Sequence, residues 1–262
     1  TVKMFTYYPE SFWKGGYIVP SMEVGFQTLR KIMSAGYRPS VVRLYSKSDF
    51  DRNFGSVELK DGQAFMFFVA EGPAALSQAT GEAIDKFARE AGGEYIGTKA
   101  VDHWLIHRND LCNGFKAPAT REYLRENNIF YATTEISANF TDIQKIYNNV
   151  MENVPKKIDN LVLLGGHVSH AYQTGLNIYF VYELKIADPL KYEQMHQAVI
   201  DAICEEVLST ETGGCVHHHG MGKQRVKFAP REHGSSYILM KNLKKMMDPN
   251  GIMNPGTLVQ EK

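Results

Sequence analysis

The stretch Ala64-Phe65-Met66-Phe67-Phe68-Val69-Ala70 decides the fold class, because this dense run of apolar and aromatic residues predicts a buried strand. Gly72-Pro73 follows as a turn. A helical pattern then runs from about Ala74 to Ala91 and stops at Gly92-Gly93. The chain therefore passes here from a buried strand directly into a long helix.

The residues before this stretch complete a supersecondary unit. Gly16 to Val19 and Val41 to Tyr45 have the short apolar pattern of strands. Between them, Ser21-Met22-Glu23 opens an amphipathic helix that ends near Gly36. Glu94-Tyr95-Ile96 offers a last short strand. The first part of the chain thus has the order β-α-β-β-α.

The same order recurs further along the chain. The predicted elements are strands at 129–136, 161–168 and 176–186 and helices at 140–154 and 189–208. Two such units predict an α+β fold: a duplicated ferredoxin-like split-βαβ plait with an antiparallel sheet, helices on one face and a C-terminal helical tail. Residues 103–128, between the units, are expected outside the sheet.

Composition limits the class of partner. The chain has 262 residues, 44% of them hydrophobic, which is enough for a full core and excludes disorder. Its 29 basic and 29 acidic residues balance, so no nucleic-acid partner is expected and an anionic small molecule must be bound by a local site. No apolar run reaches the roughly 18 residues of a membrane span, and no signal peptide is visible.

The three cysteines, Cys112, Cys204 and Cys215, are too few and too scattered for a disulfide framework. We therefore expect a soluble protein of a reducing compartment, either the cytoplasm or the interior of an organelle.

His217-His218-His219, bracketed by Gly213-Gly214 and Gly220, is the most informative motif. Glycine lets the backbone approach a ligand closely, and three imidazoles can bind an anion or transfer a proton. Zinc is the alternative. On an extended backbone, adjacent side chains point to opposite faces, so at most two of the three imidazoles could converge on an ion. We therefore expect no metal site.

Three further residues are candidates. Tyr179 lies in the predicted strand 176–186, where a phenol is ordinarily a packing residue. Arg43 lies within an apolar strand, where its charge is costly unless it is paired or reaches a pocket. Arg121 and Arg125 have helical spacing, which also fits a solvated face.

Residues 247–256, Met-Asp-Pro-Asn-Gly-Ile-Met-Asn-Pro-Gly, resemble the C-terminal signature of the FAD-linked oxidases with the vanillyl-alcohol-oxidase fold. Within that superfamily, His217 to Arg225 resembles the triple-histidine motif of the alkyl-dihydroxyacetone-phosphate synthases. Val42-Arg43-Leu44 and the block from Ser169 to Phe180 resemble these synthases too. The ending Asn254-Pro255-Gly256 departs from them and matches the commoner oxidase form.

The resemblance implies roles for named residues. Tyr179 and His218 would be catalytic, with Tyr179 as the acid/base at the substrate carbon. Arg43, Arg121, His217 and His219 would bind the substrate, and Asn254 would contact the cofactor. That cofactor is FAD, bound mainly by an N-terminal domain absent from this chain. Residues 1–216 would form the cap domain and residues 217–262 the segment that returns to the flavin domain.

The function implied is that of the substrate-binding half of an FAD-dependent enzyme. The synthases exchange an acyl for an alkyl group on a phosphorylated ketone during ether-lipid synthesis, and the intact enzyme would be a homodimer with peripheral membrane association. The first alternative is an oxidoreductase that dehydrogenates a 2-hydroxyacid or an alcohol. The second is a non-catalytic subunit that binds a ligand. The isolated chain is expected to be inactive.

Overall fold

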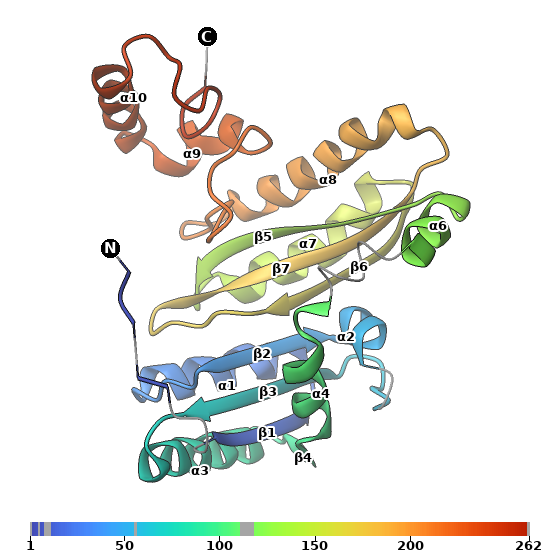
Figure 1. Cartoon of the computed structure of the whole chain (residues 1–262), viewed down its shortest axis with the longest axis vertical. Coiled ribbons are helices and arrows are strands. Elements are labelled where there is room, and N and C mark those ends of the chain that lie inside the picture. Colours follow the sequence, from blue (N-terminus) through green and yellow to red (C-terminus); the bar gives the residue numbers. More distant parts are fainter. Residues whose placement is uncertain (1, 5, 8–11, 55–56, 111–117, 261–262) are drawn as a thin grey trace. The chain divides into compact units, whose positions relative to one another are not determined.

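A computed structural model describes residues 2–4, 6–7, 12–54, 57–110 and 118–260 of the chain (Figure 1). Within this part of the chain, the strands join in a seven-stranded sheet in the order β4 (Glu94–Gly97), β1 (Phe12–Val19), β3 (Ala64–Glu71), β2 (Val41–Ser46), β6 (Leu161–Val168), β7 (Gly175–Lys185) and β5 (Ile129–Asn139). The predicted α+β class, with an antiparallel sheet and two successive β-α-β-β-α units, is confirmed. The chain divides into two compact units, which we describe one at a time. Unit 1 comprises residues 1–127 and 165–176, and unit 2 comprises residues 128–164 and 177–262.

Unit 1 is built around β3 (Ala64–Glu71), the strand expected from the aromatic stretch. β1 (Phe12–Val19) and β2 (Val41–Ser46) flank it, and both run antiparallel to it. β4 (Glu94–Gly97) pairs with the other side of β1. Every residue from Ala64 to Ala70 is buried, because both faces of this strand are covered.

One face of the unit 1 strands is covered by α1 (Met22–Ser34) and α3 (Ala74–Glu90) (Figure 1). The Ser21 side chain caps α1, as its sequence predicts. α3 approaches β1 so closely that a Cβ on Gly81 would lie 2.1 Å from the ring of Trp13. Glycine at this position therefore permits the close packing of helix on strand.

The opposite face carries helices that the sequence did not predict as separate elements. They are α2 (Lys47–Asn53) and α4 (Lys99–His107), and α6 (Pro118–Glu126) follows them in the chain. α2 and α4 pack on a cluster of buried side chains formed by Tyr45, Phe50, Phe54, Leu59, Phe65, Phe67, Val69, Ala100 and Val101. Because β3 is apolar on both faces, a second layer of helices is needed to bury its other face.

Unit 2 holds β5 (Ile129–Asn139), most of β7 (Gly175–Lys185) and the first half of β6 (Leu161–Val168). The last residues of β6 and the first two of β7 belong to unit 1. α7 (Ile143–Lys157) and α8 (Tyr192–Val207) pack against each other and against β5. These elements match the predicted ranges to within a few residues at each end.

The C-terminal part of unit 2 is irregular, as its turn-rich sequence indicates. A short 3₁₀ turn, η1 (Pro189–Lys191), precedes α8, and another, η2 (Val226–Phe228), leads into α9 (Ala229–His233) and α10 (Ser236–Met247). A small apolar cluster of Met221, Ala229, Tyr237 and Val259 joins these segments.

Several sequence expectations concern properties outside this fold. That residues 1–216 form a cap domain and residues 217–262 return to a flavin domain stays a prediction. Cys112 lies outside the described residues, and Cys204 and Cys215 are buried free thiols. None of the described helices combines the length and apolar character needed to cross a bilayer.

Candidate active site

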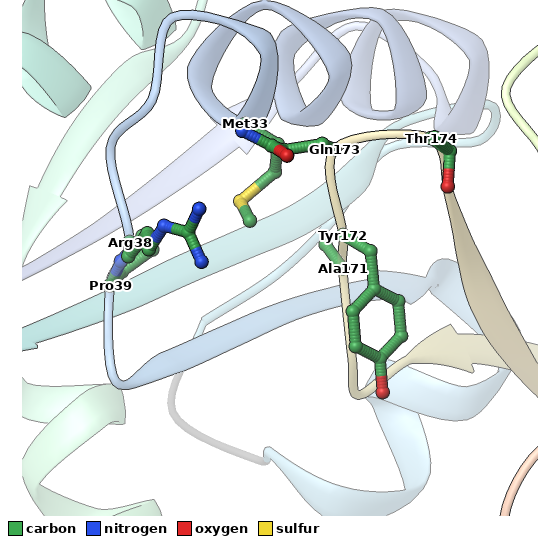
Figure 2. A pocket seen from close by; sticks show the side chains of 7 residues that line it. All are labelled: Met33, Arg38, Pro39, Ala171, Tyr172, Gln173 and Thr174. Carbon is green, nitrogen blue, oxygen red and sulfur yellow. The ribbon is translucent and has the colours of Figure 1, made fainter.

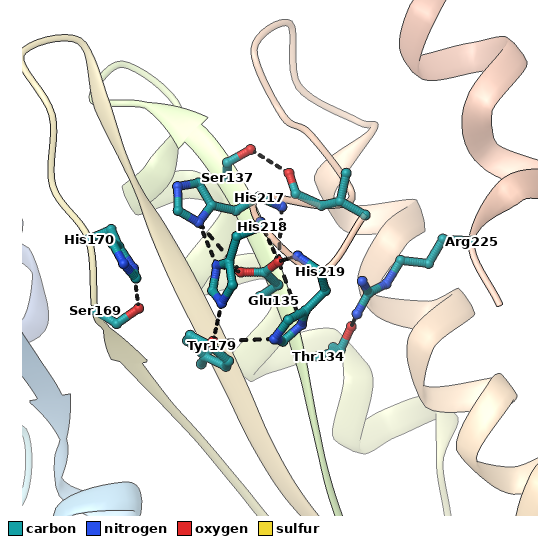
Figure 3. Close-up of polar contacts among 11 residues, drawn as sticks. Thr134, Glu135, Ser137, Ser169, His170, Tyr179, His217, His218, His219 and Arg225 are labelled. Atoms are coloured by element: carbon teal, nitrogen blue, oxygen red, sulfur yellow. Dashed lines mark hydrogen bonds and ion pairs between the residues drawn. The ribbon is translucent and has the colours of Figure 1, made fainter. Parts of the chain in front are cut away.

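The phenol of Tyr179 meets two of the three consecutive imidazoles in unit 2 (Figure 3). Its neighbours on β7, Ile178 and Phe180, are fully buried, whereas Tyr179 is half-buried. Its hydroxyl lies 2.6 Å from Nε2 of His218 and 3.3 Å from Nε2 of His219. The structure thus brings the predicted tyrosine into hydrogen-bond contact with the predicted histidines, and this contact fits proton transfer better than packing alone.

The segment that carries the imidazoles is anchored on β5. Gly214 pairs with Ser137 through two backbone hydrogen bonds of 2.9 and 2.8 Å. The hydroxyl of Ser137 donates to the carbonyl oxygen of Val216 at 2.8 Å. These contacts fix the chain just before His217.

The fully buried carboxylate of Glu135, two residues before Ser137, fixes the histidines themselves. Its Oε1 accepts hydrogen bonds from the backbone N–H groups of His217, His218 and His219, at 3.2, 2.6 and 2.5 Å. The expected extended backbone was therefore wrong, because the chain curves around one oxygen atom. All three imidazole rings therefore lie near the carboxylate of Glu135, instead of on alternate faces of a strand.

The same carboxylate lies close to the imidazole rings. Oε2 of Glu135 is 2.7 Å from Nδ1 of His218 and 3.6 Å from Nδ1 of His217, and Oε1 is 3.5 Å from Nδ1 of His219. A proton gained by any of these rings is therefore stabilised by a buried negative charge.

The charge states follow from these contacts. Burial alone would raise the pKa of Glu135, but the backbone N–H groups of His219 and His218 outweigh it and hold the pKa below its usual value. Burial lowers the pKa of His219, and the attraction of Glu135 opposes this only in part. At neutral pH, Glu135 is an anion and His219 is chiefly a neutral imidazole that can accept or donate a hydrogen bond.

Glu135, His218 and His219 also place one ligand atom each within 4.8 Å of one another, a spacing that could hold a metal ion. A metal held there would bind through the Nδ1 atoms that face Glu135, whereas Tyr179 contacts Nε2 of His218. The absence of a metal site stays a prediction, and the contact of Tyr179 with His218 is the one that a proton-transfer network would use.

The other predicted site residues are Arg43 and Arg121 of unit 1 and Asn254 of unit 2. Arg43, on β2 of unit 1, places its guanidinium 4.8 Å from the ring centroid of Trp104, and its buried Nε has no hydrogen-bond partner among the described residues. Arg121 is exposed on α6, also in unit 1. Asn254 is exposed in the tail with φ at 48°. Substrate or cofactor binding by these three residues stays a prediction.

Sequence reasoning gave no role to Glu135 or Arg225, although both are nearly inaccessible to solvent in unit 2. A signal for Glu135 was present. It lies within the predicted strand 129–136, and a carboxylate in a strand is costly unless it is paired, the same argument that singled out Arg43.

The profile of the FAD linked oxidases, C-terminal domain, matches residues 15–258. The chain belongs to this family. It is 38% identical over 265 residues to the uncharacterized FAD-linked oxidoreductase YgcU of Escherichia coli K12, an alignment that covers 98% of the chain and 54% of the relative. It is 26% identical over 276 residues to the alkyldihydroxyacetonephosphate synthase of Trypanosoma brucei brucei, covering 93% of the chain and 43% of the relative.

Solved structures include a protein of the same name as the second of these relatives. A solved structure of an alkyldihydroxyacetonephosphate synthase superimposes with a TM-score of 0.64 at 16% identity, over 94% of this chain and 44% of that one. The chain thus spans about half the length of the curated relatives it matches.

Membership of the family implies FAD as cofactor. The exposed side of the imidazole network suits the approach of a flavin ring. His218 and His219 present exposed imidazole edges, and a Cβ on Gly220 or Gly222 beside them would meet no atom within 4 Å. Hydrogen-bonding imidazole edges beside open glycine backbone fit a planar, polar ring system.

Proposed function

We propose that this chain supplies the substrate-binding side and the proton-transfer group of an FAD-dependent enzyme that acts on a small anionic substrate. The observation that carries the proposal is the 2.6 Å contact between the Tyr179 hydroxyl and His218, whose other ring nitrogen lies 2.7 Å from the buried carboxylate of Glu135. Phenol, imidazole and carboxylate lie in sequence, as in other sites where a base is oriented by a third group.

The network moves a proton in two linked transfers. Tyr179 passes its hydroxyl proton to Nε2 of His218, and the phenolate oxygen then takes a proton from the substrate. The positive charge that His218 gains faces Glu135, which stabilises the imidazolium without leaving its backbone cradle. In the reverse direction, the same groups return a proton to the product.

FAD, when bound, supplies the ring that accepts electron density from the substrate carbon. The specific reaction that we propose for the full-length protein is that of the alkyl-dihydroxyacetone-phosphate synthases, which exchange an acyl for an alkyl group on a phosphorylated ketone. It is supported by the 26% identical relative of that name and by the triple-histidine motif.

The second candidate is an oxidoreductase that dehydrogenates a 2-hydroxyacid or an alcohol. The observation that favours it is the higher, 38% identity to a relative named as an FAD-linked oxidoreductase. The same tyrosine and histidines would then take the proton of the substrate hydroxyl.

Tyr179→Phe tests the network in the full-length, flavin-bound protein. The substitution keeps the ring and removes one donor and acceptor, so we expect nearly normal substrate binding and a turnover lower by about 10²–10⁴-fold. Steady-state kinetics give the two parameters separately. Tyr95→Phe, on the exposed edge of β4, is the matched control. Turnover of Tyr179→Phe within a few-fold of wild type refutes the acid/base role.

Two assays separate the candidate reactions. Anaerobic mixing with a panel of 2-hydroxyacids and alcohols bleaches the flavin absorbance if the protein is a dehydrogenase. Incorporation of a labelled fatty alcohol into acyl-dihydroxyacetone phosphate, without lasting flavin reduction, identifies a synthase. Binding of such compounds with neither outcome would favour a non-catalytic subunit.

A further inference from the structure

The hydroxyl of Tyr179 has two imidazoles as possible proton acceptors. Nε2 of His218 lies 2.6 Å from it, and Nε2 of His219 lies 3.3 Å from it. The Nδ1 atoms of the same two rings lie 2.7 and 3.5 Å from the carboxylate of Glu135. These differences are small compared with the rotamer motion of exposed side chains. Distance alone therefore does not decide which ring takes the proton.

The two rings cannot share the task by both becoming charged. The ring centroids of His218 and His219 lie only 4.5 Å apart. Two imidazolium ions at this separation would repel each other, so a proton on one ring disfavours a proton on the other. One of the two imidazoles must stay neutral, and the charges around them determine which one.

Arg225 distinguishes the two rings by its position. Arg225 and His219 line the same pocket of about 350 Å³ within unit 2, and His218 is not among the residues that line it. Figure 3 shows the guanidinium on the side of the network where His219 lies. A positive charge at this place acts more strongly on His219 than on His218, because Coulomb interactions weaken with distance.

The charge of Arg225 is buried and is not neutralised by a carboxylate. Only 7% of the residue is exposed, and its guanidinium donates a hydrogen bond to the neutral hydroxyl of Thr134. Its buried Nε has no hydrogen-bond partner among the described residues, and none of the ion pairs within that part of the chain includes Arg225. A buried cation of this kind is costly for stability, which marks it as a candidate for a functional role.

The groups around His219 show how this charge acts. They are Glu135 on β5, Tyr179 on β7, His217 and His218 on its own segment, and Lys223 and Arg225 on the pocket wall. Burial is the first cause that lowers the pKa of His219. The carboxylate of Glu135 opposes burial, whereas the charges of His218 and Arg225 add to it. Burial also lowers the pKa of His196, and Arg225 again adds to that effect. Arg225 therefore acts against a proton on two separate imidazoles.

The pocket of unit 1 provides a contrast (Figure 2). It has about 370 Å³ and is lined by Met33, Arg38, Pro39 and residues 171–174. Its one cation, Arg38, is exposed, so water screens the charge. Lys223, on the wall of the unit 2 pocket, is exposed as well. Of the cations that line these two pockets, only Arg225 is buried.

We propose that Arg225 is a positioning residue of the proton-transfer network, whose buried charge keeps His219 neutral and so directs the proton of Tyr179 to His218. The inference rests on the proposed function, which it deepens by giving the two imidazoles different roles. His218 takes the proton because Glu135, at 2.7 Å, stabilises the positive charge that results. His219, held neutral, keeps a lone pair on Nε2 that accepts a hydrogen bond from the Tyr179 hydroxyl or from the substrate.

NMR titration of the full-length, flavin-bound protein with isotope-labelled histidine tests this role, with a metal chelator present and no substrate added. The His219 signal is identified by its loss in His219→Gln. Arg225→Met removes the charge and keeps a buried side chain, so we expect the pKa of His219 to rise by about one pH unit. Arg225→Lys keeps the charge and loses the planar fork, so this pKa should stay within about 0.3 of its wild-type value.

Lys223→Gln is the matched control, because it removes an exposed charge from the wall of the same pocket. Since water screens that charge, the pKa of His219 should again stay within about 0.3 of its wild-type value. If Arg225→Met does not fold, Arg225→Gln takes its place under the same criteria.

Three results would overturn the proposal. They are an unchanged pKa of His219 in Arg225→Met, an equal rise in Lys223→Gln, and an equal rise in Arg225→Lys. The last would mean that the arginine supports the structure and that its charge does not matter. Because the titration measures no turnover, its failure is distinguishable from that of the acid/base role. A Tyr179→Phe protein with normal turnover refutes that role, whereas the effect of Arg225 on His219 is measured independently.

Discussion

Glu135 links three imidazoles to one strand through a single side chain. Its Oε1 holds three successive backbone N–H groups, and both of its oxygens lie within 3.6 Å of imidazole nitrogens. The carboxylate determines both where His218 stands and which charge it faces.

We predict that Glu135→Gln lowers the free energy of unfolding by about 1.5–3 kcal/mol, since three backbone hydrogen bonds to a charged oxygen become bonds to a neutral amide oxygen and an N–H₂ group replaces Oε2 beside the His218 ring. Urea denaturation at pH 7 measures the change. Glu205→Gln, which removes an exposed partner of Arg231, should cost less than about 1 kcal/mol. Equal losses in the two variants would contradict a special role for the cradle.

The stability of the site should decrease as the pH falls. The pKa of Glu135 is lowered in the folded state, so its contribution is complete above its ordinary value of 4.5 and is lost as pH falls through the folded value. The pKa of His219 is also lowered, so its contribution is complete above 6.5 and is lost on acidification in the same way. A fall in pH therefore lowers the stability of the site in two steps, first through His219 and then through Glu135.

We predict that the melting temperature falls below about pH 6.5 and more steeply below about pH 4.5, with a smaller lower step in Glu135→Gln. Hydrogen exchange should show early loss of protection at residues 212–219. A melting temperature that stays flat between pH 6.5 and 4 would contradict the assignment for His219.

At the scale of elements, hydrophobic patterning was sufficient to predict a strand or a helix wherever that element buries one face. The strand at 64–70, the helices at 74–91 and 189–208 and the paired strands at 161–168 and 176–186 were all predicted close to their observed bounds. The sequence did not predict α2 and α4 as helices. Their apolar residues are buried against β3, a contact that the local sequence pattern does not show.

The site was predicted in part for the same reason. The histidines and Tyr179 stood out by type and resemblance, whereas Glu135 and Arg225 depend on contacts 82 to 91 residues away in sequence. Local pattern carries no information about such contacts.

The contact between α3 and β1 gives a prediction of its own. In an exposed helix, replacing glycine by alanine is stabilising by about 1 kcal/mol. At Gly81 the new methyl group would overlap the ring of Trp13, so we expect Gly81→Ala to be destabilising by about 1–3 kcal/mol. Gln78→Ala, one turn earlier on the exposed side, is the control for helix propensity. Chemical denaturation gives both values, and a stabilised Gly81→Ala protein would refute the close packing.

At the scale of the whole molecule, α10 and the tail carry many exposed apolar side chains. They include Ile238, Leu239, Leu243, Met246, Met247, Ile252 and Met253. Apolar groups gathered in this way mark a surface that another part of a protein covers. We propose that a flavin domain of the full-length protein is the covering part, since the chain belongs to the FAD-linked oxidases and spans 54% of the length of its 38% identical relative.

We predict that Leu239→Glu, at a position 71% exposed in this chain, lowers FAD retention in the full-length protein while leaving the stability of the 262-residue chain unchanged within about 0.5 kcal/mol. The absorbance ratio of bound flavin to protein after gel filtration measures retention. Leu190→Glu, at an even more exposed position outside this surface, should retain FAD normally. Equal retention in both variants would place the flavin domain elsewhere.

The anchoring of residues 214–219 on β5 has a kinetic consequence. Each of its contacts with Ser137 and Glu135 joins residues 77 to 84 positions apart, with β6, β7 and α8 between them. Loops of this length close late, since the chain entropy lost on closure is repaid only when both ends are already ordered. During refolding, the sheet and helices should therefore regain their circular dichroism before the histidine resonances reach native positions. The proton-transfer network would be the last part of unit 2 to assemble on the way to the native state.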